Sequence, residues 1–462
     1  MTEIKKWATH FFSNQVSIYP LVTFRIIFGL MMCYSTLRFI NKGWVTDLYV
    51  TPKFYFTYYG FDWVKPLNEE GMYFLFYLMV ALSIFIAFGL FYRFSAISFF
   101  IIFTYVELID KTNYLNHYYF VSLISFLLVF LPANKYFSLD SYFKICKSHL
   151  QVPAWSINSI KLQIIIVYVF AGIAKLNSHW LLDAQPLINW LKHQSDIPII
   201  GGLLTYDFTA YLFSWGGALF DLFIIFFLIH KKTRIAAYGL IILFHVLTAI
   251  MFPIGVFPLV MIFSTLIFFS SHFHQSIVQL ISKITLKSRS TVIHHFPQYV
   301  NSSFLYKILF GIYFTLQLLL PVRYLLYPGK LFWTEQGYRF SWRVMLIEKA
   351  GYSQFYVHEA KEDRKLAIDN RVYLTKQQIK MMSTQPDMIL QYAQYLSEEY
   401  KDSTFIESNG EVISLGKEPK ITAKVEVSLF NQGSKPFIDK NVNLTKEKRG
   451  FNHKSWILPY EN

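Results

Sequence analysis

The sequence predicts an α-helical polytopic membrane protein of eight or nine transmembrane helices with a C-terminal β-rich extramembrane domain. Hydrophobic residues make up 54% of the 462 residues, charged residues make up only 16%, and the mean hydropathy is +0.34. Soluble domains carry about 25% charged residues. A soluble globular enzyme could not bury this much apolar surface, and an intrinsically disordered chain would not contain it.

Nine apolar segments are candidates for membrane spans, which need about 20 residues or slightly fewer. The third, fourth and fifth are the shortest, so eight or nine spans are expected. No small-residue cleavage site follows the first segment, which is therefore expected to be a retained helix and not a signal peptide. The segments are 20–40, 71–92, 94–109, 118–132, 159–174, 208–229, 235–252, 254–270 and 303–322.

The distribution of Lys and Arg over the loops predicts a cytoplasmic N-terminus. With nine spans, the segments on the side of the N-terminus hold 12 basic residues and the short loops on the other side hold 6. Cytoplasmic loops are enriched in basic residues, so the C-terminal domain is expected outside. The net charge of +14 then reflects orientation and contact with anionic membrane lipid. No basic–aromatic motif predicts a nucleic-acid partner.

The two cysteines, Cys33 and Cys146, lie in an apolar run and a basic loop. Neither a disulfide framework nor a cysteine metal site is expected. The histidines at 272–274 and 294–295 have no neighbouring carboxylate or cysteine, so no metal is predicted. The shortage of cysteines and the compact length favour a bacterial cytoplasmic membrane over the endoplasmic reticulum.

Residues 1–322 are expected to form the membrane domain, and residues 323–462 a β-rich domain. Residues 421–429 alternate apolar and polar side chains, which predicts a half-buried strand. A turn at 431–433 then leads into a predicted partner strand over 436–444. Helices are predicted over 375–382 and 386–400.

Charged residues inside spans are costly and are candidates for function. Lys175 ends a long apolar run, where position alone favours a lysine that extends to the membrane interface. Arg25, Glu107 and Asp221 are expected to pair with one another or to bond polar groups of the bundle.

Six segments, in order along nearly the whole chain, carry recognisable motifs. The segment from Tyr168 to Leu176 reads Y-V-F-A-G-I-A-K-L. The others are Leu108-Ile109-Asp110-Lys111-Thr112 with Asn116-His117, Ala133 to Asp140, Phe244-His245 with Phe252 to Phe257, Trp333 to Trp342, and Ser455 to Pro459. Together they resemble the signatures of the vitamin K-dependent gamma-glutamyl carboxylase family, with an HTTM-type membrane domain.

The resemblance implies an enzyme that uses a reduced vitamin K hydroquinone, of the menaquinone or phylloquinone type. In that family, the hydroquinone reacts with the co-substrates O₂ and CO₂ and with a glutamate of a protein or peptide. The glutamate is carboxylated and the quinone leaves as its epoxide. The C-terminal domain is then a candidate for contact with the glutamate substrate. The oligomeric state is not predicted.

The family assigns the first deprotonation of the hydroquinone to the lysine that matches Lys175. Burial disfavours the charged form of an amine, as a general base requires. Asn116 and His117 match the Asn-His pair beside the quinone head, where they would orient its oxyanion. A solvated loop position is the alternative for His117.

Further residues are expected at the same site. His179 follows Lys175 by four residues, so a continuing helix would place both on one face. The alternatives are an interfacial position for His179 and a packing contact between helices for His245. The predicted cofactor-binding residues are Tyr114, Tyr168, His179 and His245, and the predicted substrate-binding residues are Tyr338 and Trp342.

Two other functions remain open. One is a quinol epoxidase that lacks glutamate carboxylation. The other is a non-catalytic membrane transporter or scaffold, although the sequence shows no internal repeat of the kind that many transporters carry.

Overall fold

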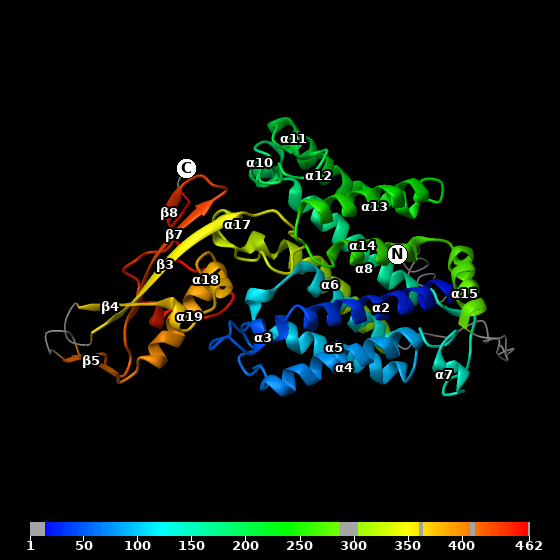
Figure 1. Cartoon of the computed structure of the whole chain (residues 1–462), viewed down its shortest axis with the longest axis horizontal. Helices are drawn as coiled ribbons and strands as arrows, with labels where there is room; N and C mark the ends of the chain where they lie inside the picture. The colour runs from blue at the N-terminus through cyan, green and yellow to red at the C-terminus, as the bar shows by residue number, and fades with distance from the viewer. Residues whose placement is uncertain (1–13, 286–303, 360–363, 407–411, 461–462) are drawn as a thin grey trace.

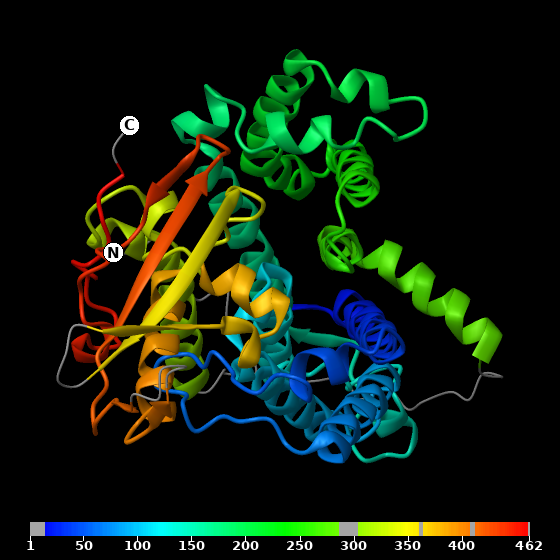
Figure 2. The ribbon, with the colours of Figure 1, turned by 60° about the vertical axis from the view of Figure 1, so that its left-hand side comes forward.

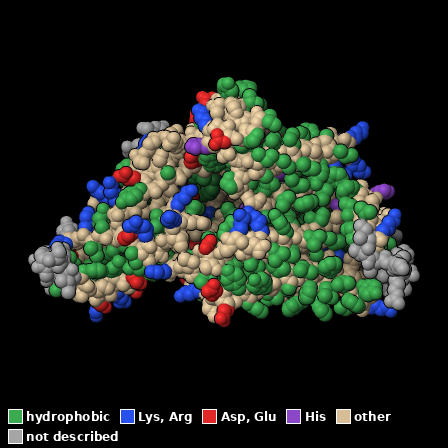
Figure 3. Space-filling view, in the orientation of Figure 1, with side chains coloured by type: hydrophobic (Ala, Val, Ile, Leu, Met, Phe, Trp, Pro, Cys, Tyr) green, Lys and Arg blue, Asp and Glu red, His purple; other side chains and the backbone are tan. Residues whose placement is uncertain are grey.

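The computed structural model describes residues 14–285, 304–359, 364–406 and 412–460. A bundle of long helices forms one part, and a β-containing C-terminal part lies at one end of it (Figure 1). Hydrophobic side chains cover much of the bundle surface, whereas charged side chains gather on the C-terminal part and near the bundle ends (Figure 3). This distribution fits a bundle that is embedded in a bilayer.

Among the described residues, seven helices are long and apolar enough to cross a membrane, or eight if a bent pair counts as one span. The predicted fold class is confirmed, with one span fewer than expected. The seven are α2 (Tyr19–Asn41), α4 (Glu69–Phe88), α5 (Tyr92–Ile109), α8 (Trp155–Lys175), α12 (Asp207–Ile229), α13 (Arg234–Met251) and α16 (Phe304–Leu319) with its extension η3 (Leu320–Leu326).

Two predicted spans differ from the long helices. The segment 118–132 forms α6 (Asn116–Phe130), which has only 15 residues because Leu131 precedes a proline and leaves the helical region. The segment 254–270 forms α14 (Phe257–Thr265) and η2 (Leu266–Phe268). The chain then bends by 115° into α15 (Ser271–Thr285).

The buried guanidinium of Arg25 is bonded by backbone carbonyls. It donates to the carbonyl oxygens of Ala133 at 2.7 Å and Phe137 at 2.6 Å, so it pairs with neither Glu107 nor Asp221. In the same connection, Asp140 accepts from the backbone N–H groups of Phe91 and Tyr92 at the start of α5. The 133–140 motif therefore organises one end of the bundle.

The C-terminal part contains a four-stranded antiparallel sheet in the order β4-β3-β7-β8 (Figure 2). Alternate residues of β7 face Phe355 on β3 and the helix α19, which explains the period of two in its sequence. The elements are β3 (Lys349–His358), β4 (Lys365–Ile368), β7 (Ile421–Leu429), β8 (Ser434–Pro436), α18 (Lys376–Met382) and α19 (Pro386–Glu399).

The predicted partner strand over 436–444 is wrong. After β7 the chain turns and returns as β8, in which Ser434 pairs with Ser428, and the other neighbour of β7 is β3. Beyond it the chain leaves the sheet, because the side chains of Asp439 and Asn443 bond backbone N–H groups two residues on and favour turns. An isolated antiparallel bridge then joins Ile438 to Ile457.

The short elements connect these parts. They are α3 (Trp44–Tyr49), η1 (Lys111–Asn113), α7 (Leu139–Tyr142), α9 (Ser178–Leu181), α10 (Leu187–Lys192), α11 (Gly201–Leu204), α17 (Leu331–Thr334), η4 (Asn370–Val372) and η5 (Leu444–Lys446), with the paired strands β1 (Gln15–Ser17) and β2 (Gln151–Pro153), and β5 (Thr404–Ile406) and β6 (Val412–Ser414).

A buried ionic cluster joins the C-terminal part to the bundle. Lys111, directly after α5, places Nζ 2.8 Å from Asp387 Oδ2 and 3.0 Å from Gln391 Oε1 of α19. Arg339 places Nη1 2.8 Å from the same carboxylate oxygen. Desolvation lowers the pKa of Lys111 to about 8 although Asp387 partly offsets it. Desolvation acts to raise the pKa of Asp387, but the two cations hold it well below its usual value.

We expect Asp387→Asn to destabilise the folded protein by about 2 kcal/mol, because it leaves two cations without a counter-charge. The effect is smaller than for a fully buried pair, since the Asp387 side chain is 35% exposed. Thermal unfolding in an uncharged detergent measures it. Asp369→Asn is the control, because its partner Arg371 is 81% exposed and the change is expected to be near zero. Equal shifts in both variants would contradict the prediction.

Candidate functional site

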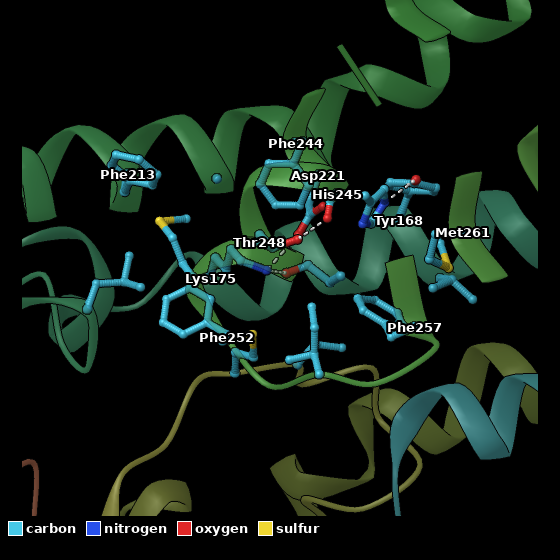
Figure 4. A pocket seen from close by; sticks show the side chains of 18 of the residues that line it. Tyr168, Lys175, Phe213, Asp221, Phe244, His245, Thr248, Phe252, Phe257 and Met261 are labelled. Atoms are coloured by element: carbon cyan, nitrogen blue, oxygen red, sulfur yellow. Dashed lines mark hydrogen bonds and ion pairs between the residues drawn. The ribbon is translucent and has the colours of Figure 1, made fainter. Parts of the chain in front are cut away.

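An apolar cavity of about 90 Å³ lies between α8, α12, α13 and α14 (Figure 4), and Val344 and Met345 also contribute to its lining. Its polar side chains are few and include one lysine and one aspartate. The lining residues are Val167, Tyr168, Ala171, Lys175, Trp180, Leu187, Phe213, Gly217, Asp221, Phe244, His245, Thr248, Met251, Phe252, Ile254, Phe257, Met261, Val344 and Met345.

Lys175, the last residue of α8, forms a buried ion pair in this cavity. Its Nζ lies 2.6 Å from Oδ2 of Asp221 on α12, and the two side chains are only 7% and 10% exposed. The same Nζ lies 3.4 Å from the carbonyl oxygen of Ala171 and 5.4 Å from the Trp180 ring centroid. Lys175 therefore does not extend to the membrane interface; it is held inside the bundle.

A close helix crossing makes this pair possible. A Cβ atom on Gly172 would lie 2.7 Å from the backbone N and Cα atoms of Leu222, so only glycine allows α8 and α12 to approach this closely. Trp180 supports the same crossing, because its Nε1 donates to the carbonyl oxygen of Ser214 at 2.7 Å. The ion pair thus depends on a contact between two helix backbones.

Tyr168 and His245, both predicted at the quinone site, lie together in the cavity (Figure 4). The Tyr168 hydroxyl is 3.2 Å from Nε2 of His245. Tyr168 precedes Lys175 by seven residues, or about two turns of α8. The cavity therefore has a charged end and a neutral hydrogen-bonded end.

His117 lies beside the cavity but not in its lining. It is buried at the start of α6, which the solvated-loop alternative did not expect. The Phe257 ring separates it from His245, with centroids 5.8 Å and 5.6 Å from the two imidazoles. Phe257, which lines the cavity, therefore contacts both imidazole rings.

Asn116 and Tyr114 position a neighbouring wall. The Asn116 side-chain amide donates to the carbonyl oxygen of Arg343 at 3.2 Å and its oxygen accepts from the Tyr114 hydroxyl at 3.1 Å. Tyr114 also accepts from the backbone N–H of Phe340. Trp342 is buried and stacks on the Tyr119 ring at 5.0 Å. These contacts fix the segment that leads into Val344 and Met345 of the cavity.

His179 and Tyr338 lie apart from the cavity lining. Helix α8 ends at Lys175, and the Asn177 side chain caps α9, so His179 is not on a continuation of α8. The His179 ring packs on Phe430 at 4.9 Å, while Tyr338 lies against Phe332. The expected shared helix face of Lys175 and His179 is therefore absent.

The site also contains residues that sequence reasoning missed. Asp221 was expected to pair with Arg25 or Glu107 or to bond polar groups of the bundle, whereas its partner is Lys175 on α8. The side chains of Met251, Met261 and Met345 were not singled out, although they form flexible parts of the wall. Among the described residues, no group of three or more His, Cys, Asp or Glu side chains could hold a metal ion.

Comparison with known families covers most of the chain. The profile described as "HTTM domain" matches residues 14–273, and the profile described as "Vitamin K-dependent gamma-carboxylase, lumenal domain" matches residues 302–462. The chain belongs to the vitamin K-dependent gamma-carboxylase family. No solved structure matches the chain.

Residues from both matched regions of this gamma-carboxylase family member line the cavity. Lys175, Asp221 and His245 lie in the first region, while Val344 and Met345 lie in the second. The second matched region begins at residue 302 and so also includes the last span, α16. The two regions thus build one site.

We predict that Gly172→Ala destabilises the protein by about 1–3 kcal/mol, because the added methyl group overpacks the α8–α12 crossing. The thermal midpoint in detergent, compared at one scan rate, reports the change.

Gly216→Ala on α12 is the matched control, since a Cβ there meets no atom within 4 Å. It is expected to be neutral or slightly stabilising. A Gly172→Ala protein as stable as this control would show that the close crossing is not required.

Proposed function

We propose that this protein is a vitamin K-dependent gamma-glutamyl carboxylase. The overall reaction would convert a hydroquinone, O₂, CO₂ and a protein glutamate into a quinone epoxide, water and gamma-carboxyglutamate. The buried pair of Lys175 and Asp221 in an apolar cavity, in a chain of this family, carries the proposal. A buried ion pair is expensive in a membrane protein, and a catalytic role accounts for its presence there.

Asp221 gives Lys175 a route to its neutral form. Transfer of one ammonium proton across the 2.6 Å contact leaves a neutral amine and a neutral carboxylic acid. In an apolar surrounding, a neutral pair avoids the cost of two buried charges. The free amine then accepts a proton from a hydroxyl group of a ligand in the cavity.

The cavity suits a hydroquinone chemically. When bound, the hydroquinone would be oxidised by O₂, and this oxidation would supply the strong base for the reaction. Lys175 would face one hydroxyl group, while Tyr168 and His245 would hold the opposite edge of the ring. Aromatic and aliphatic walls exclude water, which would otherwise quench reactive species.

The cavity is too small for a hydroquinone unless side chains move. A cavity of about 150 Å³ accommodates a benzene molecule, and this cavity has about 90 Å³. A two-ring quinol therefore enters only when side chains move. Met251, Met261 and Met345 supply that freedom, because an unbranched thioether side chain has several accessible rotamers.

The glutamate substrate would approach from the C-terminal part, which we place outside the cell membrane with the N-terminus in the cytoplasm. Lys175 lies at the bundle end that faces this part, and Val344 and Met345 reach its cavity. Tyr338 would contact the substrate at the surface. Buried Trp342 would act by positioning this wall.

The charges in the cavity lining favour a quinol epoxidase without carboxylation as the second candidate function. The only cation in the cavity lining is Lys175, and Asp221 already pairs with it. The described lining thus offers no second cation for a glutamate carboxylate. A quinol epoxidase without carboxylation would need only the hydroquinone half of the site.

We predict that Lys175→Met abolishes epoxide formation, at least 100-fold, while the protein stays folded, because it removes the base and preserves the stem of the side chain. Purified protein with vitamin K hydroquinone, O₂, labelled bicarbonate and a Glu peptide tests it. Lys192→Ala is the control, since this lysine is 49% exposed and pairs with Asp207.

The same assay separates the functions. Epoxide with fixed CO₂ supports the carboxylase, and epoxide alone supports the epoxidase. If the wild type forms neither product, both enzymatic functions are wrong and a transporter or scaffold is favoured. If Lys175→Met is as active as an active wild type, Lys175 is not the base.

Asp221→Asn is predicted to lower kcat for epoxidation by about 10–1,000-fold with little change in KM, because an amide cannot take the Lys175 proton. Asp221→Glu should recover part of the rate. Steady-state kinetics of the three proteins provide the test. A rise in KM without loss of kcat would instead indicate a role in binding.

A further inference from the structure

A second, larger cavity lies at the opposite end of the bundle. It has a volume of about 830 Å³ and is bounded by the starts of α2 and α8, the connection between α12 and α13, and the bend before α15. The C-terminal part and the Lys175 cavity are at the other end (Figure 1). Nothing in the proposed reaction uses this second cavity.

Three cations line it: Lys161 on α8, Lys231 in the α12–α13 connection, and Arg234 at the start of α13. No acidic side chain is in the lining, and within the described ranges none of the three forms an ion pair with a carboxylate. The sequences 1–13, before β1, and 286–303, after α15, contain a single acidic residue, Glu3. The protein itself therefore supplies little negative charge to this cavity.

The cations are held in place although they lack counter-ions. Arg234 donates from Nε to the carbonyl oxygen of Leu228 at 3.0 Å and from Nη2 to that of Ile229 at 2.8 Å. Lys161, a partly buried residue of a membrane span, lies with Nζ 5.7 Å from the Phe268 ring. Lys161 and Arg234 are partly buried and Lys231 is exposed. Three cations that line one cavity repel one another, and a bound anion relieves that cost.

The rest of the lining is apolar or neutral and indicates what kind of anion fits. Phe268, Phe269 and Phe273 form one wall, with Pro20 and Ile235 nearby. Helix α15 starts there at 115° to the preceding span, which is the geometry of a helix that lies along the membrane surface. A helix α15 on the membrane surface would place the cations at headgroup depth and the aromatic wall beside the acyl region.

We infer that this cavity binds an anionic phospholipid, with the phosphate between Lys161, Lys231 and Arg234 and an acyl chain along the phenylalanine wall. A soluble phosphate compound would use the cations and leave the aromatic wall uncovered. Basic pockets between helices at the cytoplasmic end are known headgroup sites in membrane proteins. The inference is independent of the catalytic proposal.

The test uses the full-length protein in an uncharged detergent with added dioleoyl phosphatidylglycerol. Native mass spectrometry should show one retained phosphatidylglycerol, and the thermal midpoint should rise with its concentration. Phosphatidylcholine and free glycerol phosphate are the comparison ligands and should give no comparable rise. Equal effects of phosphatidylcholine and phosphatidylglycerol, or of free glycerol phosphate, would overturn the inference.

Variants locate the site. Lys161→Met and Lys231→Ala should each weaken phosphatidylglycerol binding about fivefold, since one basic residue near a lipid surface contributes about that factor. Lys232→Ala removes the same charge from the neighbouring residue outside the cavity and should bind normally.

If Lys161→Met does not fold, Lys231→Ala still tests the site, because Lys231 is exposed. Equal weakening by Lys231→Ala and Lys232→Ala would show general surface attraction and no site. Unchanged binding in Lys231→Ala would likewise contradict the proposed location.

Discussion

The ion pair between Lys175 and Asp221 is the contact on which the architecture of the site depends. Two charges inside an apolar bundle are stable only when their geometry is close and their surroundings are fixed. Gly172 allows the backbones of α8 and α12 to approach closely. Trp180, which follows α8, donates a hydrogen bond to the carbonyl oxygen of Ser214 on α12. The apolar walls then make the pair the dominant polar feature of the cavity.

The C-terminal part forms a wall of this site and is not a separate appendage. A single motif region between α5 and α6 makes both connections: Lys111 bonds Asp387 of α19, and Asn116 bonds the backbone at Arg343. The first contact fixes the domain on the bundle, and the second directs Val344 and Met345 into the cavity. The position of the C-terminal part therefore determines the shape of the space beside Lys175.

Local signals in the sequence predicted the parts that local physics determines. Alternation defined the strand 421–429, and the capping box of Thr375 and Gln378 begins α18 where the sequence predicted a helix. Contacts between distant segments were not predictable from one sequence. Asp221 is 46 residues from Lys175, and the longest strand, β3, has pairing partners on both sides that its own residues do not specify. The cap at Asn177 turned His179 away from the face that a continuous helix would give it.

The two ends of the bundle differ in whether their cations have carboxylate partners. Near the C-terminal part, Lys175, Lys111 and Lys349 are each matched by a carboxylate at 2.6–2.9 Å. At the other end, Lys161, Lys231 and Arg234 converge without one in the described ranges. A cluster of cations without carboxylate partners is stabilised when its surroundings supply an anion, and a lipid headgroup layer would do so. This asymmetry gives a structural reason for the distribution of Lys and Arg from which the cytoplasmic N-terminus was predicted.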